Sequence, residues 1–182
     1  TEAAMSQKDL DSHVIRLMLE EPFYAGVLRG ITYVRTEEIP TAGVSTKGCE
    51  ITMYWNPKFI SSLSRDEIKG LLKHEAMHLA LMHTTDRRMN PHIVHNYATD
   101  LAINSDIPSS ELPAGGLVPG KEFDDLTDEQ LAKMPAEAVE RYYRISKKIS
   151  EFEPHKSSEW YFSKLLEDEE LSKDIQDSDN AE

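Results

Sequence analysis

Three histidines and a glutamate fall within ten residues, in a stretch where a single helix is expected. They are His74, Glu75, His78 and His83 in the sequence KHEAMHLALMH. Residues four apart in a helix lie one turn apart on the same face, so His74 and His78 can occupy two corners of a zinc tetrahedron. Glu75 lies beside them, where it can take a proton from the attacking water and pass it to a leaving amine. This spacing indicates a zinc centre that hydrolyses peptide bonds.

A catalytic zinc has a third protein ligand, and two residues compete for that position. His83 comes nine residues after His74, on the opposite side of a straight helix, so it can ligate only if the helix breaks soon after the motif. Asp100 is favoured because it falls on a second expected helix, residues 91–104. Asn104, one turn further on, is expected to orient Asp100 or to contact a ligand histidine. We therefore predict Glu75 as general base, His74, His78 and Asp100 as ligands, and His83 and Asn104 as residues around them, with His83 the alternative ligand.

The alternative interpretation is a helix that merely carries polar residues on one side, because the five-residue motif is short. Its context favours the metal. Five of the seven histidines lie between positions 74 and 95, where an even distribution would scatter them. The sequence assigns no substrate-binding residue.

The helix that carries the motif has a clear start. SRDE, Ser64 to Glu67, matches a capping box, and apolar residues then recur at helical spacing. Before it, GITYVR (residues 30–35) and CEITMYWN (residues 49–56) are rich in β-branched and aromatic residues and predict two strands, joined by a loop that contains TAGVSTKG. With a helix over residues 6–20 and helices after the motif, the layout is α+β, a small sheet beside a helical layer.

Length and charge limit the classes of protein that fit. A chain of 182 residues with 39% apolar residues is expected to form one domain, residues 1–166. Residues 167–182 hold eight acidic residues against one lysine and predict a disordered acidic tail. The net charge of −13 argues against nucleic acid and an anionic membrane surface as partners. The single cysteine and the lack of an apolar run of membrane length predict a cytoplasmic location.

The sequence also resembles a known family, the metallopeptidase domain at the N-terminus of VWA-like domain proteins of bacteria and phages. The resemblance covers roughly residues 8–150 and rests on PFYAGVL, on NP, HExxHxxxxH and RR within YWNPKFISSLSRDEIKGLLKHEAMHLALMHTTDRR, and on NYATDLAIN. It implies a zincin-like fold in which the active helix packs under a small sheet whose edge strand can hold an extended peptide. It also implies an alternative function, a non-catalytic metal-binding or interaction module that works with a MoxR-type AAA ATPase, a VWA-like domain or a phage partner.

Overall fold

The computed structural model describes residues 7–82 and 89–179, and these residues form two compact units. The first, here the sheet unit, comprises the described residues of 1–88 together with 107–113. The second, here the helical unit, comprises those of 89–106 and 114–182. The chain therefore leaves the sheet unit, returns to it for seven residues, and leaves again.

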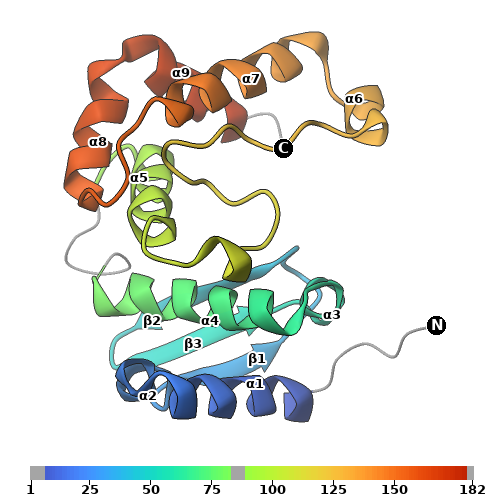
Figure 1. The fold of residues 1–182 in the computed structure, drawn as a ribbon, viewed down its shortest axis with the longest axis vertical. Coiled ribbons are helices and arrows are strands. Elements are labelled where there is room, and N and C mark those ends of the chain that lie inside the picture. Colours follow the sequence, from blue (N-terminus) through green and yellow to red (C-terminus); the bar gives the residue numbers. More distant parts are fainter. Residues whose placement is uncertain (1–6, 83–88, 180–182) are drawn as a thin grey trace. The chain divides into compact units, whose positions relative to one another are not determined.

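The sheet unit is built around a three-stranded sheet in the order β1-β3-β2 (Figure 1). β1 (Thr32–Arg35) runs parallel to β3 (Glu50–Trp55), whereas β2 (Ala42–Lys47) pairs with β3 as an antiparallel hairpin. Gly48 makes the hairpin turn with a φ of 61°, a conformation that glycine adopts without steric cost. β3 is therefore the central strand, and β1 and β2 are the edges.

Helices cover the sheet through the side chains of alternate residues of β3. α1 (Gln7–Glu20), α2 (Pro22–Leu28), α3 (Pro57–Ser62), α4 (Arg65–Ala80) and the 3-10 helix η1 (Ser109–Glu111) belong to this unit. Met53 and Trp55 are fully buried in one cluster with Leu10 and Leu17 of α1 and Leu72 of α4. Tyr54, between them in sequence, is 40% exposed, so the core lies against the face of the sheet that carries Met53 and Trp55.

The helical unit packs around α5 (His92–Asn104). Its other helices are α6 (Asp128–Lys133), α7 (Ala136–Ser150), α8 (Ser158–Glu167) and α9 (Glu169–Asp179). Its core joins Ala98 and Leu101 of α5 to Ile149 of α7, Leu165 of α8 and Ile175 of α9, and each of these side chains is fully buried. Among the helices described in residues 7–82 and 89–179, none is long and apolar enough to cross a membrane.

The structure agrees with the predicted α+β class and differs from the sequence-based expectation in the strands. The segment expected to be a loop between two strands contains β2. Gly43 lies inside β2 and weakened its signal, since glycine is depleted in strands, but antiparallel pairing of six residues with β3 holds the segment extended.

The second comparison concerns domain organisation and the acidic tail. The structure divides the described residues into two compact units, and the single domain expected over residues 1–166 stays a prediction. Residues 169–179, expected to be disordered, form α9, with Leu171 and Ile175 buried at helical spacing. Asp174 on the same helix accepts two hydrogen bonds from Arg144 of α7, at 2.8 and 2.9 Å. Arg144, thirty positions earlier in the sequence, thus neutralises part of the acidic charge of α9. A count of the charged residues within the segment does not reveal this ion pair.

This packing predicts a large loss of stability when α9 loses its buried side chain. Ile175→Ala removes apolar atoms from the core of the helical unit and leaves a cavity, so it should lower the free energy of unfolding by roughly 2–5 kcal/mol. Lys173→Ala changes an exposed residue of the same helix and should stay within about 0.5 kcal/mol of wild type. Denaturant unfolding curves measure both. Equal stability of the two variants would mean that α9 is not packed.

Candidate metal centre

The helix α4 begins with the predicted capping box. The Ser64 side chain accepts from the Glu67 backbone N–H at 3.2 Å, and the Glu67 carboxylate accepts from the Ser64 N–H at 2.7 Å. The buried residues Ile68, Leu72 and Ala76 then recur every four positions and attach the helix to the core of the sheet unit. Rotation of α4 about its axis is thereby fixed, and so is the direction in which the motif residues point.

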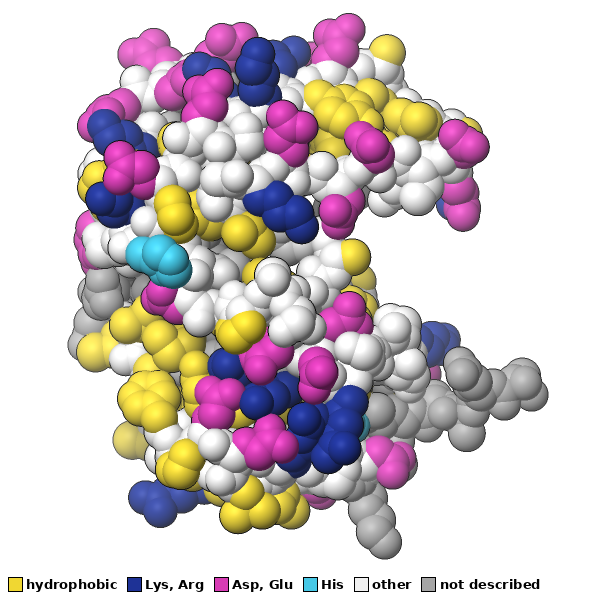
Figure 2. All heavy atoms as spheres, in the orientation of Figure 1, with side chains coloured by type: hydrophobic (Ala, Val, Ile, Leu, Met, Phe, Trp, Pro, Cys, Tyr) yellow, Lys and Arg dark blue, Asp and Glu magenta, His cyan; other side chains and the backbone are white. Residues whose placement is uncertain are grey.

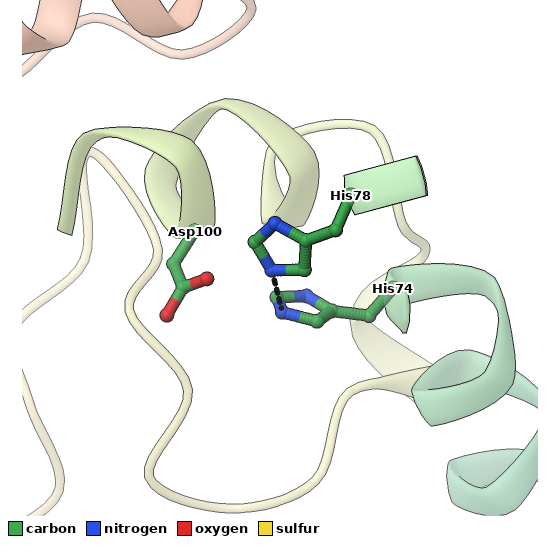
Figure 3. A group of neighbouring side chains, drawn as sticks. All are labelled: His74, His78 and Asp100. Atoms are coloured by element: carbon green, nitrogen blue, oxygen red, sulfur yellow. Dashed lines mark hydrogen bonds between the residues drawn. The ribbon is translucent and has the colours of Figure 1, made fainter. Parts of the chain in front are cut away.

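The structure brings His74 and His78 together on successive turns of α4. Their Nε2 atoms are 3.0 Å apart, and the two rings meet edge to face with centroids 4.7 Å apart (Figure 3). Two ligands of a tetrahedral zinc, with Zn–N bonds of about 2.0–2.1 Å, have their nitrogens about 3.3 Å apart. The two imidazoles are therefore close to the spacing that one metal ion requires, and small rotations of the rings reach it.

Glu75 lies between the two histidines in sequence, and its side chain is turned toward the interior. It is only 6% exposed. A carboxyl group in this environment is shielded from bulk water, and general bases of hydrolases are commonly found in such surroundings.

The end of α4 bears on the alternative ligand His83. The helix ends at Ala80, and Met82 adopts a left-handed backbone conformation with a φ of 59°. The helix therefore breaks soon after the motif, which is the condition that the sequence set for His83 to ligate. His83 itself lies outside the described residues.

Asp100 and Asn104, the other predicted residues of the centre, both lie on α5 of the helical unit. Asp100 is half-buried, and its carboxylate is one of the groups that bind zinc. The Asn104 side chain is 5% exposed, and its amide donates to the carbonyl of Leu117 at 2.8 Å. Asn104 thus fixes the loop after α5, a role that the sequence did not suggest.

Sequence reasoning missed a group of charged residues next to the motif. Lys73, the residue before His74, is 5% exposed, and its Nζ lies 2.7 Å from Glu111 Oε2 and 3.2 Å from Glu21 Oε1. Lys69, one turn earlier, lies 2.9 Å from the same Glu21 oxygen and 3.5 Å from Glu111 Oε1. We call these four residues the lysine cluster. Figure 2 shows acidic and basic side chains intermixed over α1 and α4.

The charges of the lysine cluster stabilise one another. Burial alone would lower the pKa of Lys73, but its hydrogen bonds to Glu111 and Glu21 outweigh burial and raise that pKa above its usual value. The pKa of Lys69 is raised mainly by its hydrogen bond to Glu21. Burial tends to raise the pKa of Glu21, yet hydrogen bonds from both lysines hold it below its usual value. The cluster is thus most stable fully charged.

Comparison with known proteins identifies a family. A family model described as "Putative metallopeptidase domain" matches residues 5–159, which include all six residues predicted to form or surround the centre. The comparisons with curated proteins and with solved structures found no match.

The left-handed residue at the end of α4 predicts a stabilising substitution. A side chain in this conformation costs roughly 1–2 kcal/mol, which glycine avoids, although glycine also makes the unfolded chain more flexible. Met82→Gly should therefore raise the free energy of unfolding by up to about 1 kcal/mol. Met82→Ala keeps the steric cost and should give no gain. Denaturant unfolding of the metal-free protein measures both, and equal stability of the two variants would contradict the prediction.

The lowered pKa of Glu21 predicts a loss of stability in acid. A carboxyl whose folded pKa is depressed contributes stability above its unfolded value of 4.5 and loses this contribution as the pH falls through its folded value. The free energy of unfolding should therefore decrease below about pH 4.5, and Glu21→Gln should make that decrease smaller. Glu38→Gln, at an exposed loop position, should leave the profile unchanged. Identical acid profiles for wild type and Glu21→Gln would contradict this.

Proposed function

We propose a function from one premise: this chain belongs to the family described as a "Putative metallopeptidase domain", because the family model covers most of its length. Family membership indicates metal-dependent proteolysis. We propose that the metal is zinc and that the protein is a zinc-dependent endopeptidase of zincin type. The finding that carries the proposal is the pair of Nε2 atoms of His74 and His78, 3.0 Å apart on one face of α4.

The proposed ligands are His74, His78 and Asp100, the three side chains drawn in Figure 3. Two imidazole nitrogens and one carboxylate oxygen suit zinc, and three protein ligands leave the fourth position of a tetrahedron open to water or substrate. His74 and His78 lie on α4, and Asp100 lies on α5. A zinc ion bound there would polarise the peptide carbonyl and lower the pKa of the attacking water to about 7.

Glu75 would carry the proton transfers of the reaction. Its carboxylate would accept the proton of the attacking water, and the resulting carboxylic acid would donate that proton to the leaving amine. Its place on α4, next to one proposed ligand and three residues before the other, keeps it beside both. Its shielding from bulk water favours transfer to the substrate over exchange with solvent.

An extended peptide is the substrate that the sheet unit would accommodate. β2 pairs with β3 on one side only, so its other edge offers backbone N–H and C=O groups. β2 also contacts α4, the helix of the motif. Addition of a substrate strand to β2 would place a peptide beside this helix.

The proposal predicts different effects for the residues of the centre. Purified protein should carry about one zinc per chain. Glu75→Gln should keep the metal and reduce peptide cleavage by about 10²–10⁴-fold, because only the proton transfer is lost. His78→Ala and Asp100→Asn should lower zinc affinity, whereas His83→Ala should not. Metal analysis and chelator competition measure binding, and comparison of protein termini produced by wild type and Glu75→Gln in a proteome would identify the cleaved bonds.

Three results would each contradict part of this assignment. A wild-type protein that binds no zinc after gentle purification would overturn the metal centre. Zinc binding with no cleavage by wild type would favour the alternative, a non-catalytic module that acts with an AAA ATPase, a VWA-like domain or a phage partner. If His83→Ala lost zinc and Asp100→Asn kept it, the third ligand would be His83 and not Asp100.

A further inference from the structure

Residues 107–113, here called the strap, make an excursion from the helical unit to the sheet unit. The chain enters the strap just after α5 and returns to the helical unit at residue 114. A hydrogen bond joins the chain before the strap to the chain after it, because Asn104 at the end of α5 donates its amide hydrogen to the carbonyl of Leu117. η1, residues Ser109–Glu111, lies within the strap. The strap is therefore a closed loop that starts and ends beside the same helix.

The strap contacts α4 at Gly70, where only glycine fits. A Cβ atom at this position would overlap the backbone carbonyl of Glu111. Gly70 is buried inside the helix α4, where alanine would otherwise be the better helix former. It lies four residues before His74 and eight before His78, so all three share one side of the helix. The strap thus covers the turn that directly precedes the proposed ligands.

The lysine cluster fixes the strap in this position. Glu111 directs one carboxylate oxygen to Lys73 and the other to Lys69, at 2.7 and 3.5 Å between oxygen and Nζ. The side chains of Glu111 and Lys73 are 14% and 6% exposed, so loss of either charge leaves the other poorly solvated. Lys73 is adjacent to His74, and the two lysines are one turn apart. A shifted strap would lose at least one of these contacts.

The covalent chain connects this anchor to the third proposed ligand. Asp100 lies one helical turn before Asn104, about 6 Å along α5. Ile107, the start of the strap, is three positions after Asn104, and three residue steps span at most about 11 Å. An anchored strap therefore limits how far the end of α5 can move from the sheet unit.

We propose that the strap positions Asp100 for metal binding, with Lys73 and Glu111 as positioning residues and Gly70 as the site that admits the strap to α4. This inference rests on the proposed function, because it takes Asp100 as the third ligand. Lys73 and Glu111 act through the strap and do not ligate.

The first test measures hydrogen exchange in the metal-free full chain. Glu111→Gln removes the charge and keeps the shape of the side chain, and Gly70→Ala blocks docking without changing any charge. Both should speed exchange of the Glu111 and Leu112 N–H groups, which hydrogen bond within the strap. Matched controls are Glu37→Gln, which breaks the exposed ion pair with Lys58, and Gly26→Ala, at a helical glycine with open space around it. Unchanged exchange in both test variants would contradict the proposal that Glu111 and Gly70 anchor the strap on α4.

The second test is a double-mutant cycle on zinc affinity, measured by chelator competition. Glu111→Gln should weaken zinc binding about tenfold or more in the wild-type background, in the range found for residues that orient metal ligands. It should have little effect once Asp100→Asn has removed the ligand, because the strap then has nothing to position. Glu37→Gln should leave the affinity unchanged in both backgrounds.

The outcomes separate the strap from the proposed function. An equal loss of affinity in both backgrounds would show that Glu111 acts on α4 alone and would overturn the positioning role. No zinc binding by wild type would instead overturn the proposed function and the positioning role together. The hydrogen-exchange test would still decide whether the strap is anchored on α4.

Discussion

The rotational setting of α4 is the constraint on which the rest of the sheet unit depends. Ile68, Leu72 and Ala76 point into the core, and Gly70, His74 and His78 follow the same four-residue spacing two positions later. Two residues correspond to about 200° around a helix, so the two sets lie on nearly opposite sides. Burial of the first set therefore determines where the second set points. The hydrophobic core thus gives the two imidazoles a common direction, and their Nε2 atoms lie 3.0 Å apart.

The charged residues of the lysine cluster then determine how η1 packs against α4 near the motif. Buried lysines are costly unless carboxylates accompany them, and here Glu21 comes from the junction of α1 and α2 while Glu111 comes from η1. An apolar contact in the same place would tolerate sliding by a residue. A carboxylate that contacts two lysines one turn apart does not, so the cluster specifies one register between η1 and α4.

Local signals predicted α4 well, and contacts distant in sequence account for what was missed. The capping box at Ser64 and the apolar spacing after it are complete within one helix, and the structure has both. No local sequence pattern predicts that Lys73 pairs with Glu111, thirty-eight residues later, or that Arg144 pairs with Asp174. The sequence of α9 appears acidic because carboxylates outnumber its two buried apolar residues, Leu171 and Ile175. β2 depends on pairing with β3, which its own residues favour only weakly.

The order of residues along one side of α4 connects these constraints. Gly70 admits the strap, His74 and His78 follow on the next two turns, and the helix then ends at Ala80 with Met82 in a left-handed conformation. A side chain at position 70 would exclude the strap, and a helix extended past Ala80 would carry the following residues around to the opposite side. Each end of the proposed centre is therefore defined by a backbone requirement, the lack of a Cβ at one end and the break of the helix at the other. Between these two points the only freedom left to His74 and His78 is rotation of their side chains, which is the motion that a shared metal ion requires.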